Sequence, residues 1–167
     1  MSTQQNVTDP APRRPRPYVR RPDWVARRLA NPLVSALHRL GLGVGGSRQL
    51  VVRGRKSGTD RRAPVNLLVV EGRYYLVAPR GHVQWTHNLR AAGEGRLRLG
   101  RRENAFTAVE VAEAARPELL RAYLKRWQPQ VGAYFRGVTR DSTDAELRAV
   151  AADHPVFELT FSAGSRP

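Results

Sequence analysis

The segment Gly54–Arg55–Lys56–Ser57–Gly58 combines two glycines, two cations and a hydroxyl within five residues. Glycines that flank a turn adopt positive φ readily, which lets successive backbone N–H groups face one cluster of ligand oxygens. Arg55, Lys56 and the nearby Arg61 are able to neutralise a phosphate, and Ser57 offers a hydroxyl. The segment is not a Walker loop, because the Gly-Lys-Ser order and the following helix are missing. Its two interpretations are a phosphate cradle and an exposed basic hairpin turn.

A second group of candidate residues follows in Ala78–Pro79–Arg80–Gly81 and Trp85–Thr86–His87–Asn88–Leu89. Trp85 is suited to pack beside a flat heterocycle, Asn88 to hydrogen-bond the carbonyls of such a ring, and Arg80 to add positive charge. The alternative is that Trp85 is a core residue at helical spacing and Asn88 is a local cap.

The residue types that are absent or sparse exclude several other chemistries. The chain has no cysteine, so disulfides, thiolate metal sites and thiol catalysis are excluded. His82 and His87 are five residues apart, on different helix faces, and no carboxylate pair joins them, so no metal site is expected. Acidic residues are sparse among the predicted strands, which disfavours hydrolysis by paired carboxylates. Any catalysis is therefore expected to come from a bound cofactor.

Basic residues outnumber acidic residues by 29 to 14, which gives a formal net charge of +15. Such an excess indicates an anionic partner, namely nucleic acid, a membrane surface or a phosphorylated small molecule, unless arginines simply fill solvated faces. No recognised nucleic-acid motif accompanies the basic stretch 13–62, so no specific nucleic-acid partner is expected. No apolar run approaches the ~20 residues that span a bilayer, and no apolar signal core is seen. We therefore expect a cytoplasmic protein.

The length of 167 residues indicates one domain with a substantial core. Residues 1–21 are polar, rich in proline and basic, which is typical of a disordered tail. Residues 22–167 are expected to form the folded domain. Asp23 is placed to cap a first short helix, and Asn31 with Pro32 to begin a second. The basic and apolar character of this helix pair leaves open a peripheral contact with an anionic membrane.

Strand patterns dominate the middle of the chain and determine the predicted fold class. We expect strands at Gln49–Arg53, Arg62–Val70, Arg73–Ala78, Arg96–Leu99, Ala105–Val111 and Val156–Phe161. Turns at Glu71–Gly72 and near Arg101–Arg102 join two hairpins. Helical patterns cover Gln84–Ala91, Arg116–Phe135 with interruptions at Pro129 and Gly132, and a segment from Thr143, with Glu146 completing a capping box, to about Ala152.

Short turns between successive strands predict a mostly antiparallel sheet. A doubly wound fold is disfavoured, because it requires helices and strands to alternate. The predicted class is α+β or mainly β, a small barrel with helices packed on its outside.

The two candidate segments resemble two motifs of the deazaflavin-dependent nitroreductase family, in the same order. The residues are Leu50–Gly58, Arg61 and Pro64 for the first motif, and Val77–Gly81, Trp85 and Asn88–Leu89 for the second. The Asn31–Leu33 stretch is similar to the entry helix of the family. The resemblance covers roughly residues 31–161, and two ordered motifs make it more specific than either one alone.

The resemblance implies a split β-barrel that binds coenzyme F420, an 8-hydroxy-5-deazaflavin with a phosphate and an oligoglutamate tail. It also implies a reductase that passes a hydride to a quinone, a nitro compound or another electrophile such as an enone. By position, the phosphate and tail would be held by Arg55, Lys56, Ser57 and Arg61, with Gly58 in the turn and Arg62 and Pro64 continuing along the cofactor. The deazaflavin ring would be lined by Val77, Ala78, Pro79, Arg80, Gln84, Trp85 and Asn88.

The sequence departs from the family pattern at three places. Pro79 stands where members often have a small hydroxyl residue, and Arg80 replaces the usual lysine while keeping its charge. Residues 127–134 correspond to a tyrosine-rich substrate wall, of which only Tyr134 is retained. Tyr134 is therefore the candidate catalytic residue, to shape the acceptor site or donate a proton. The alternative is a core or surface tyrosine.

Two other functions fit the same residues. Related split barrels bind FMN, so an FMN reductase or binding protein is the first alternative. The second is a non-enzymatic module that binds nucleic acid or sequesters the deazaflavin. Barrels of this type often form dimers, so a homodimer is also left open by analogy.

Overall fold

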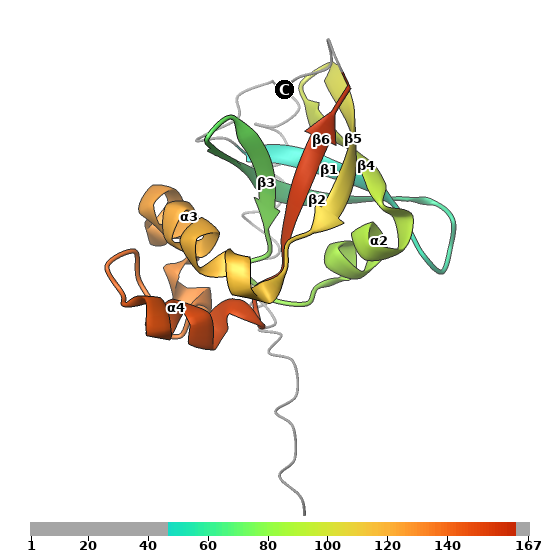
Figure 1. Cartoon of the computed structure of the whole chain (residues 1–167). Coiled ribbons are helices and arrows are strands. Elements are labelled where there is room, and N and C mark those ends of the chain that lie inside the picture. Colours follow the sequence, from blue (N-terminus) through green and yellow to red (C-terminus); the bar gives the residue numbers. More distant parts are fainter. Residues whose placement is uncertain (1–46, 163–167) are drawn as a thin grey trace, which may run out of the picture.

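The computed structural model describes residues 47–162, a barrel with helices packed at one end (Figure 1). The strands are β1 (Ser47–Arg53), β2 (Asp60–Val70), β3 (Arg73–Val77), β4 (Glu94–Leu99), β5 (Arg102–Glu110) and β6 (Val156–Phe161). The helices are α2 (Gln84–Ala92), α3 (Arg116–Val131) and α4 (Asp144–Ala151), with short 3-10 segments η2 (Glu113–Ala115) and η3 (Gly132–Tyr134). The tail expected at 1–21 and the helices expected from Asp23 and Asn31 lie outside the described residues.

The strands close into a barrel in the order β1-β2-β3-β6-β5-β4, and each neighbouring pair is antiparallel. This confirms the predicted fold class. The last strand completes the barrel, because β6 pairs with β3 on one side and β5 on the other. Helix α2 lies to one side of the barrel end, and α3 with α4 lies to the other (Figure 1).

The hairpin of β2 and β3 turns at the two residues that the sequence predicts. Glu71 has φ of 49° and Gly72 has φ of 75°, and the strands resume with Val70 opposite Arg73. Positive φ at both central residues belongs to the type I′ turn, whose twist matches that of paired strands. The turn therefore fixes the register of β3, and with it the position where β3 ends beside the candidate site.

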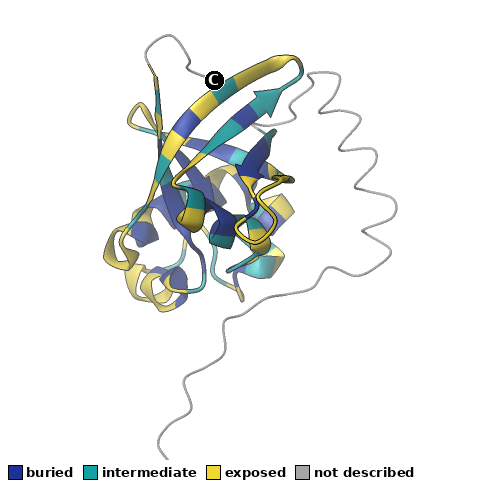
Figure 2. Cartoon of the chain, turned by 90° about the vertical axis from the view of Figure 1, so that its right-hand side faces the viewer, coloured by how far each residue is buried: buried dark blue, intermediate teal, exposed yellow. Residues whose placement is uncertain are grey.

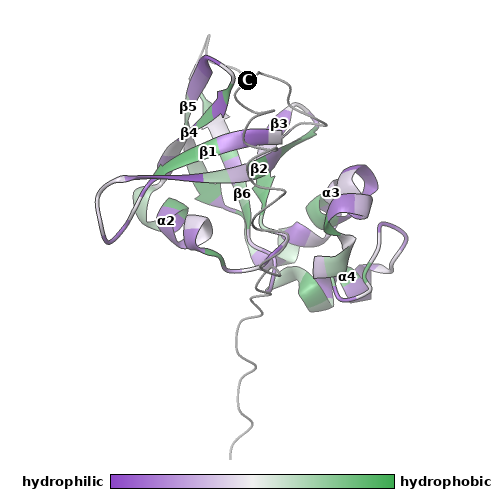
Figure 3. Ribbon diagram, turned by 180° about the vertical axis from the view of Figure 1, so that it is seen from behind, coloured by the Kyte–Doolittle hydropathy of each residue, from purple (hydrophilic) through white to green (hydrophobic). Residues whose placement is uncertain are grey.

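Buried apolar residues form two clusters. The first fills the barrel and includes Leu50, Leu97 and Phe157, each at most 1% exposed. The second lies between the sheet and the helix pair, where α3 contributes Leu120 and Tyr123 at helical spacing. Figure 2 shows the buried residues gathered in the strands and on the inner faces of the helices, with exposed residues at the loops. Figure 3 shows the complementary pattern, since the β1–β2 loop is strongly hydrophilic.

Several predicted boundaries are wrong. The first, second, fourth and fifth strands begin two or three residues earlier than predicted, and the third and fifth end one residue earlier. The largest difference is in α3. Pro129 was expected to interrupt the helix from Arg116, but α3 continues through Pro129 and ends at Val131, and Gly132 is its C-cap. A proline removes one backbone hydrogen bond, here only two residues from the end of the helix. The buried side chains of Trp127 and Val131, 2% and 6% exposed, keep the last turn packed against the core.

No helix in residues 47–162 is long and apolar enough to cross a membrane.

Candidate cofactor site

The β1–β2 loop is a tight turn held by its own backbone. Gly54 N–H donates to the Thr59 carbonyl at 2.9 Å, and Gly58 N–H donates to the Gly54 carbonyl at 2.8 Å. Gly58 adopts φ of +66°, whereas Gly54, for which the sequence also allowed positive φ, does not. Gly54 is required for a different reason: a Cβ there would lie 2.7 Å from Ser57 Oγ and 3.1 Å from the Thr59 carbonyl oxygen.

Arg55 connects this loop to α2. Its Nη1 donates to Gln84 Oε1 at 3.0 Å and to Asn88 Oδ1 at 2.9 Å, and its backbone N–H also points at Asn88 Oδ1, at 3.3 Å. The two segments singled out in the sequence therefore meet. Asn88 is not a local cap: Val83 holds the N-cap position of α2, and the Asn88 amide contacts a residue 33 positions earlier.

The loop carries a large positive charge that neighbouring residues leave uncompensated. Residues 53–62 hold five cations (Arg53, Arg55, Lys56, Arg61 and Arg62) and one acid, Asp60. Asp60 pairs with Arg96 of β4 at 2.5 Å, and none of the five cations forms an ion pair within residues 47–162. Within the described part of the chain, the side chain of Arg55 binds only neutral amide oxygens, and no carboxylate there compensates its charge.

The hydroxyl of Ser57 supports the turn itself. Its Oγ lies 2.9 Å from Thr59 Oγ1 and accepts from Arg61 Nη2 at 3.3 Å. Arg61 is therefore oriented along the loop. Arg62 and Pro64 are exposed at the start of β2, opposite Val51 and Gln49 of β1.

Cations also surround the neighbouring face of α2. The pKa of His87 is lowered, first by partial burial and then by the positive charges of Arg55 and Arg90. Burial is the larger cause, and the smaller contributions of Arg55 and Arg90 indicate a positive potential on this face of α2. This potential is the electrostatic property that a phosphate or carboxylate site requires.

The second segment, Val77–Gly81, is buried at its start and reaches the surface at Arg80. Val77 and Ala78, at the end of β3, are 1% and 0% exposed, so they lie beneath the surface. Gly81 takes φ of +79° and donates its N–H to the Ala78 carbonyl at 3.0 Å. The same carbonyl lies 3.3 Å from Nδ1 of the buried His154, whose pKa burial lowers to about 4. A neutral imidazole thus fixes the turn that carries Pro79 and Arg80.

Arg80 and Tyr134 lie together. The Arg80 guanidinium carbon is 5.1 Å from the centre of the Tyr134 ring, within the range of a cation–π contact. Tyr134 is half-buried in η3, and Arg80 is exposed in the loop after β3. The candidate ring-binding segment and the candidate acceptor residue therefore adjoin, although 54 positions separate them in the sequence.

Trp85 combines features of both interpretations. Its ring packs on Phe157 of β6, with centroids 5.8 Å apart and planes at 54°, and it joins the edge of the barrel cluster. It is only partly buried, so part of the indole remains on the surface. Gln84, the first residue of α2, is exposed and contacts Arg55.

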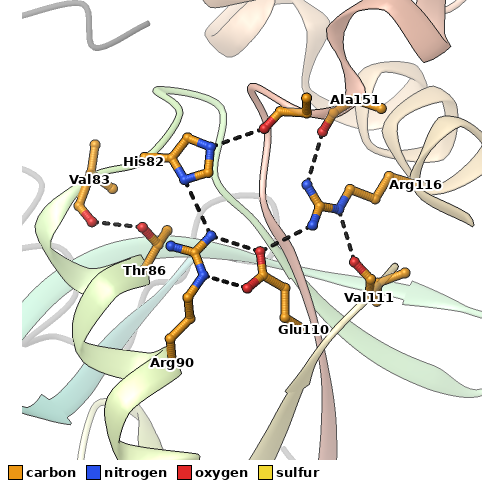
Figure 4. A network of polar contacts seen from close by, with 9 residues as sticks. His82, Val83, Thr86, Arg90, Glu110, Val111, Arg116 and Ala151 are labelled. Atoms are coloured by element: carbon orange, nitrogen blue, oxygen red, sulfur yellow. Dashed lines mark hydrogen bonds and ion pairs between the residues drawn. The ribbon is translucent and has the colours of Figure 1, made fainter. Parts of the chain in front are cut away.

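A polar network behind the site was missed in the sequence (Figure 4). Glu110 at the end of β5 accepts from Arg90 Nη2 at 2.7 Å and from Arg116 Nη2 at 3.1 Å. Arg116 also donates to the carbonyls of Val111 and Ala151 at 2.9 and 3.1 Å. The hydrogen bond from Arg90 is the main reason why the pKa of Glu110 is lowered. Residues so far apart in sequence carry no local pattern, so no signal in the sequence could have found them.

Neither a metal cluster nor the hollow described next coincides with the candidate cofactor site. Residues 47–162 hold no group of three or more His, Asp or Glu side chains able to share a metal ion. A hollow of about 270 Å³ lies where η2 and the start of α3 meet α4, and it is lined by Ala114, Ala115, Pro117, Glu118, Asp144 and Arg148. None of these is a predicted site residue.

A closed antiparallel barrel with a cationic loop fastened to a helix fits a cofactor-binding barrel of the split-barrel class. The family model described as F420H(2)-dependent quinone reductase matches residues 18–143. The match spans most of the chain, and the chain belongs to this family. Family membership confirms the relationship that the two motifs predicted, and with it coenzyme F420 as the family's cofactor.

Solved structures of similar fold agree with the barrel. One described as an F420-H2 dependent reductase (FDR-A) has 21% identity and a TM-score of 0.50 over 69% of this chain and 94% of its own. One described as a domain-swapped dimer has 22% identity and a TM-score of 0.51 over 82% and 97%. The protein Atu2129, of unknown function, from Agrobacterium tumefaciens has 12% identity and a TM-score of 0.51 over 90% and 63%. Among curated proteins, none matches the chain.

Proposed function

We propose that the chain is a reductase that uses reduced coenzyme F420 to transfer a hydride to a quinone or a related electrophile of the nitro or enone type. The main observation in support is the pair of hydrogen bonds from the Arg55 side chain to Gln84 and Asn88, at 3.0 and 2.9 Å. It joins the loop proposed for the phosphate and tail to the helix proposed for the ring. Membership of the F420H(2)-dependent quinone reductase family supports this assignment of cofactor and acceptor class.

In this proposal the β1–β2 loop holds the anionic end of the cofactor. Arg55, Lys56 and Arg61 provide the charge, Ser57 and Gly58 shape the turn, and Arg62 and Pro64 continue along the exposed start of β2. Each charge-assisted hydrogen bond to an anion contributes roughly 1.5–3 kcal/mol. The uncompensated charge on this loop favours such an anion without any rearrangement of ion pairs.

The other end of the site holds the flat ring and the acceptor. Pro79, Arg80 and the exposed edge of Trp85 would contact the ring, while the buried Val77 and Ala78 support it from beneath. When bound, the cofactor supplies the hydride. The chain's own task is to orient the acceptor and exclude water at the point of transfer. Tyr134, beneath Arg80, is placed to shape the acceptor side.

The first test is a fluorescence titration with oxidised coenzyme F420. The Arg55→Ala/Lys56→Ala variant should bind at least about tenfold more weakly than the native chain, because two charge-assisted contacts are lost. The matched control is Arg101→Ala/Arg102→Ala, which removes two exposed arginines at the turn between β4 and β5. Equal affinity of the first variant and the native chain would refute the anion site.

The second test concerns turnover. Oxidation of the reduced coenzyme should be followed with quinones, nitroaromatics and enones, with native chain and the Tyr134→Phe variant side by side. Turnover with at least one class is expected, with quinones first on the basis of the family. A yellow protein that purifies with flavin and does not bind F420 would favour the FMN alternative instead.

The oligomeric state is a separate question. A homodimer is in keeping with the neighbour described as a domain-swapped dimer, and light scattering on the purified protein checks it.

A further inference from the structure

The loop that carries Pro79 and Arg80 ends at His82, whose imidazole lies between two other elements (Figure 4). Its Nδ1 is 3.3 Å from Arg90 Nη2, on the last turn of α2. Its Nε2 is 3.0 Å from the carbonyl oxygen of Ala152, at the end of α4. One side chain therefore connects the loop to both sides of the barrel end.

The chemistry of these two partners fixes the protonation state of His82. An arginine only donates hydrogen bonds, and a carbonyl oxygen only accepts them. Nδ1 must therefore be the acceptor from Arg90, and Nε2 must carry the hydrogen that it donates to Ala152. Only the neutral imidazole with hydrogen on Nε2 satisfies both contacts. In the imidazolium, Nδ1–H would face the Arg90 guanidinium, so the hydrogen bond would be replaced by repulsion between two cations.

We propose that His82 is a positioning residue for the cofactor site, which fastens the loop 79–83 to α2 and α4 only while its imidazole is neutral. The proposal rests on the proposed function, because it assumes that this loop contacts the cofactor. It predicts that cofactor affinity decreases as His82 takes up a proton.

The charged groups around His82 favour this sensitivity. His87 and Arg90 from α2, Glu110 from β5 and His154 after α4 interact with His82. Arg116 from α3 binds the far side of Glu110, and Arg80 and Asp153 are near His82 and Ala152 in the chain. The single Glu110 carboxylate already binds both Arg90 and Arg116, and Asp153 pairs with Arg136 at 3.0 Å. A proton on His82 thus adds a positive charge to a group in which no carboxylate is unshared.

Two histidines beside His82 need separate treatment. The His87 ring lies 6.3 Å from the His82 ring, centroid to centroid, and also interacts with the backbone of His82, so its contribution is measured separately with His87→Gln. His154 is buried and its pKa is lowered to about 4, so it stays neutral while an ordinary histidine titrates.

Two hydrogen bonds within the loop 79–83 do not depend on the protonation of His82. Gly81 N–H to Ala78 O and Val83 N–H to Gly81 O, at 3.0 and 2.8 Å, do not involve the imidazole. The turn itself would survive, while its attachment to α2 would be lost. The expected cost is the loss of about one hydrogen bond's net contribution, which weakens binding about three- to tenfold.

The first experiment needs no cofactor. Imidazole ¹⁵N NMR on the full chain, with His82 assigned from the His82→Gln variant, should show hydrogen on Nε2 at about pH 8. The amide resonances of Gly81 and Val83, followed in the His87→Gln protein, should shift when His82 takes up a proton and should not shift once His82→Gln is added. Hydrogen on Nδ1, or amide shifts that persist in this double variant, would overturn the proposal.

The second experiment measures the affinity for oxidised F420 from about pH 8 to about pH 5. Glutamine keeps one acceptor and one donor without titrating, so His82→Gln should lose the three- to tenfold weakening that the native chain and His87→Gln show. Titration of the cofactor itself is common to all three proteins and cancels in the comparison. The same pH profile in His82→Gln and the native chain would overturn the proposal. If none of the proteins binds F420, the proposed function fails, and the cofactor-free experiment still decides whether His82 fastens the loop.

Discussion

Asn88→Asp separates the two interpretations of the basic loop. The substitution preserves the shape of the side chain and both contacts of Oδ1, at 2.9 Å to Arg55 Nη1 and 3.3 Å to its backbone N–H. It changes the partner of Arg55 from a neutral amide to a carboxylate. If Arg55 only anchors the loop to α2, the affinity of the folded variant for the cofactor should be unchanged. If Arg55 binds an anion, the new carboxylate competes with that anion.

The size of the effect follows from Coulomb's law. A carboxylate on one side of the guanidinium and a phosphate on the other are separated by about 6 Å. Their repulsion is roughly 0.7 kcal/mol at the dielectric constant of water and about 2.8 kcal/mol at an effective value of ~20. The affinity for F420 should therefore fall about three- to hundredfold. The pairing with Arg55 should offset only part of the desolvation of a carboxylate at Asn88, which is 5% exposed, so the free energy of unfolding should fall by about 1–3 kcal/mol.

The assay is F420 fluorescence titration at two salt concentrations, with chemical denaturation of the same proteins. The loss of affinity should shrink at high salt, because the repulsion is partly screened. Asn104→Asp, on β5 and away from the loop, makes the same change in net charge and serves as the control. An Asn88→Asp protein that binds F420 as tightly as the Asn104→Asp control would refute the assignment of Arg55 to the anion site.

Three further predictions concern the residues behind the site. Burial lowers the pKa of His154 to about 4, so the unfolded chain binds this proton more readily than the folded chain. The free energy of unfolding should therefore fall as the pH drops from about 6.5 to about 4, by up to roughly 3 kcal/mol. Denaturation midpoints of the native chain and of His154→Gln across this pH range check the prediction. Gly81→Ala should cost about 1 kcal/mol or more in urea denaturation, because φ of +79° strains any residue with a Cβ. Glu110→Gln should lower stability by about 1 kcal/mol at neutral pH, since the largely buried Arg116 loses its carboxylate. Because the pKa of Glu110 is lowered in the folded state, the native chain should lose this advantage as the pH falls through that lowered pKa, so the two proteins should converge in acid.

The barrel was predictable because each of its strands is marked locally. The Glu71–Gly72 turn has the residues that a two-residue hairpin requires, and β6 points Phe157 and Leu159 inward and Thr160 outward.

 Burial follows this alternation, because Phe157 and Leu159 are 1% and 4% exposed while Thr160 is exposed. Antiparallel pairing then followed from the short connections. The end of α3 was misjudged because the packing of Trp127 and Val131, a tertiary effect, outweighs the local cost of Pro129.

The candidate site was predictable in part. The residues of the β1–β2 loop and α2 were identified from their types, but their meeting through Arg55 and Asn88 depends on the path of the chain around the barrel end. The adjacency of Arg80 and Tyr134 has the same origin. The Glu110 network was out of reach, because an ion pair between distant arginines and a glutamate leaves no pattern in a sequence already rich in arginine.

The position of β6 has a consequence for the synthesis of the protein. A ribosome makes both segments of the candidate site long before it reaches Val156, yet β3 and β5 lack their shared neighbour until that strand emerges. The edges of β3 and β5 therefore remain unpaired in the nascent chain until β6 has been synthesised. A message truncated shortly before Val156 would encode every predicted site residue and still yield an open sheet, prone to pairing with other chains rather than to binding a ligand.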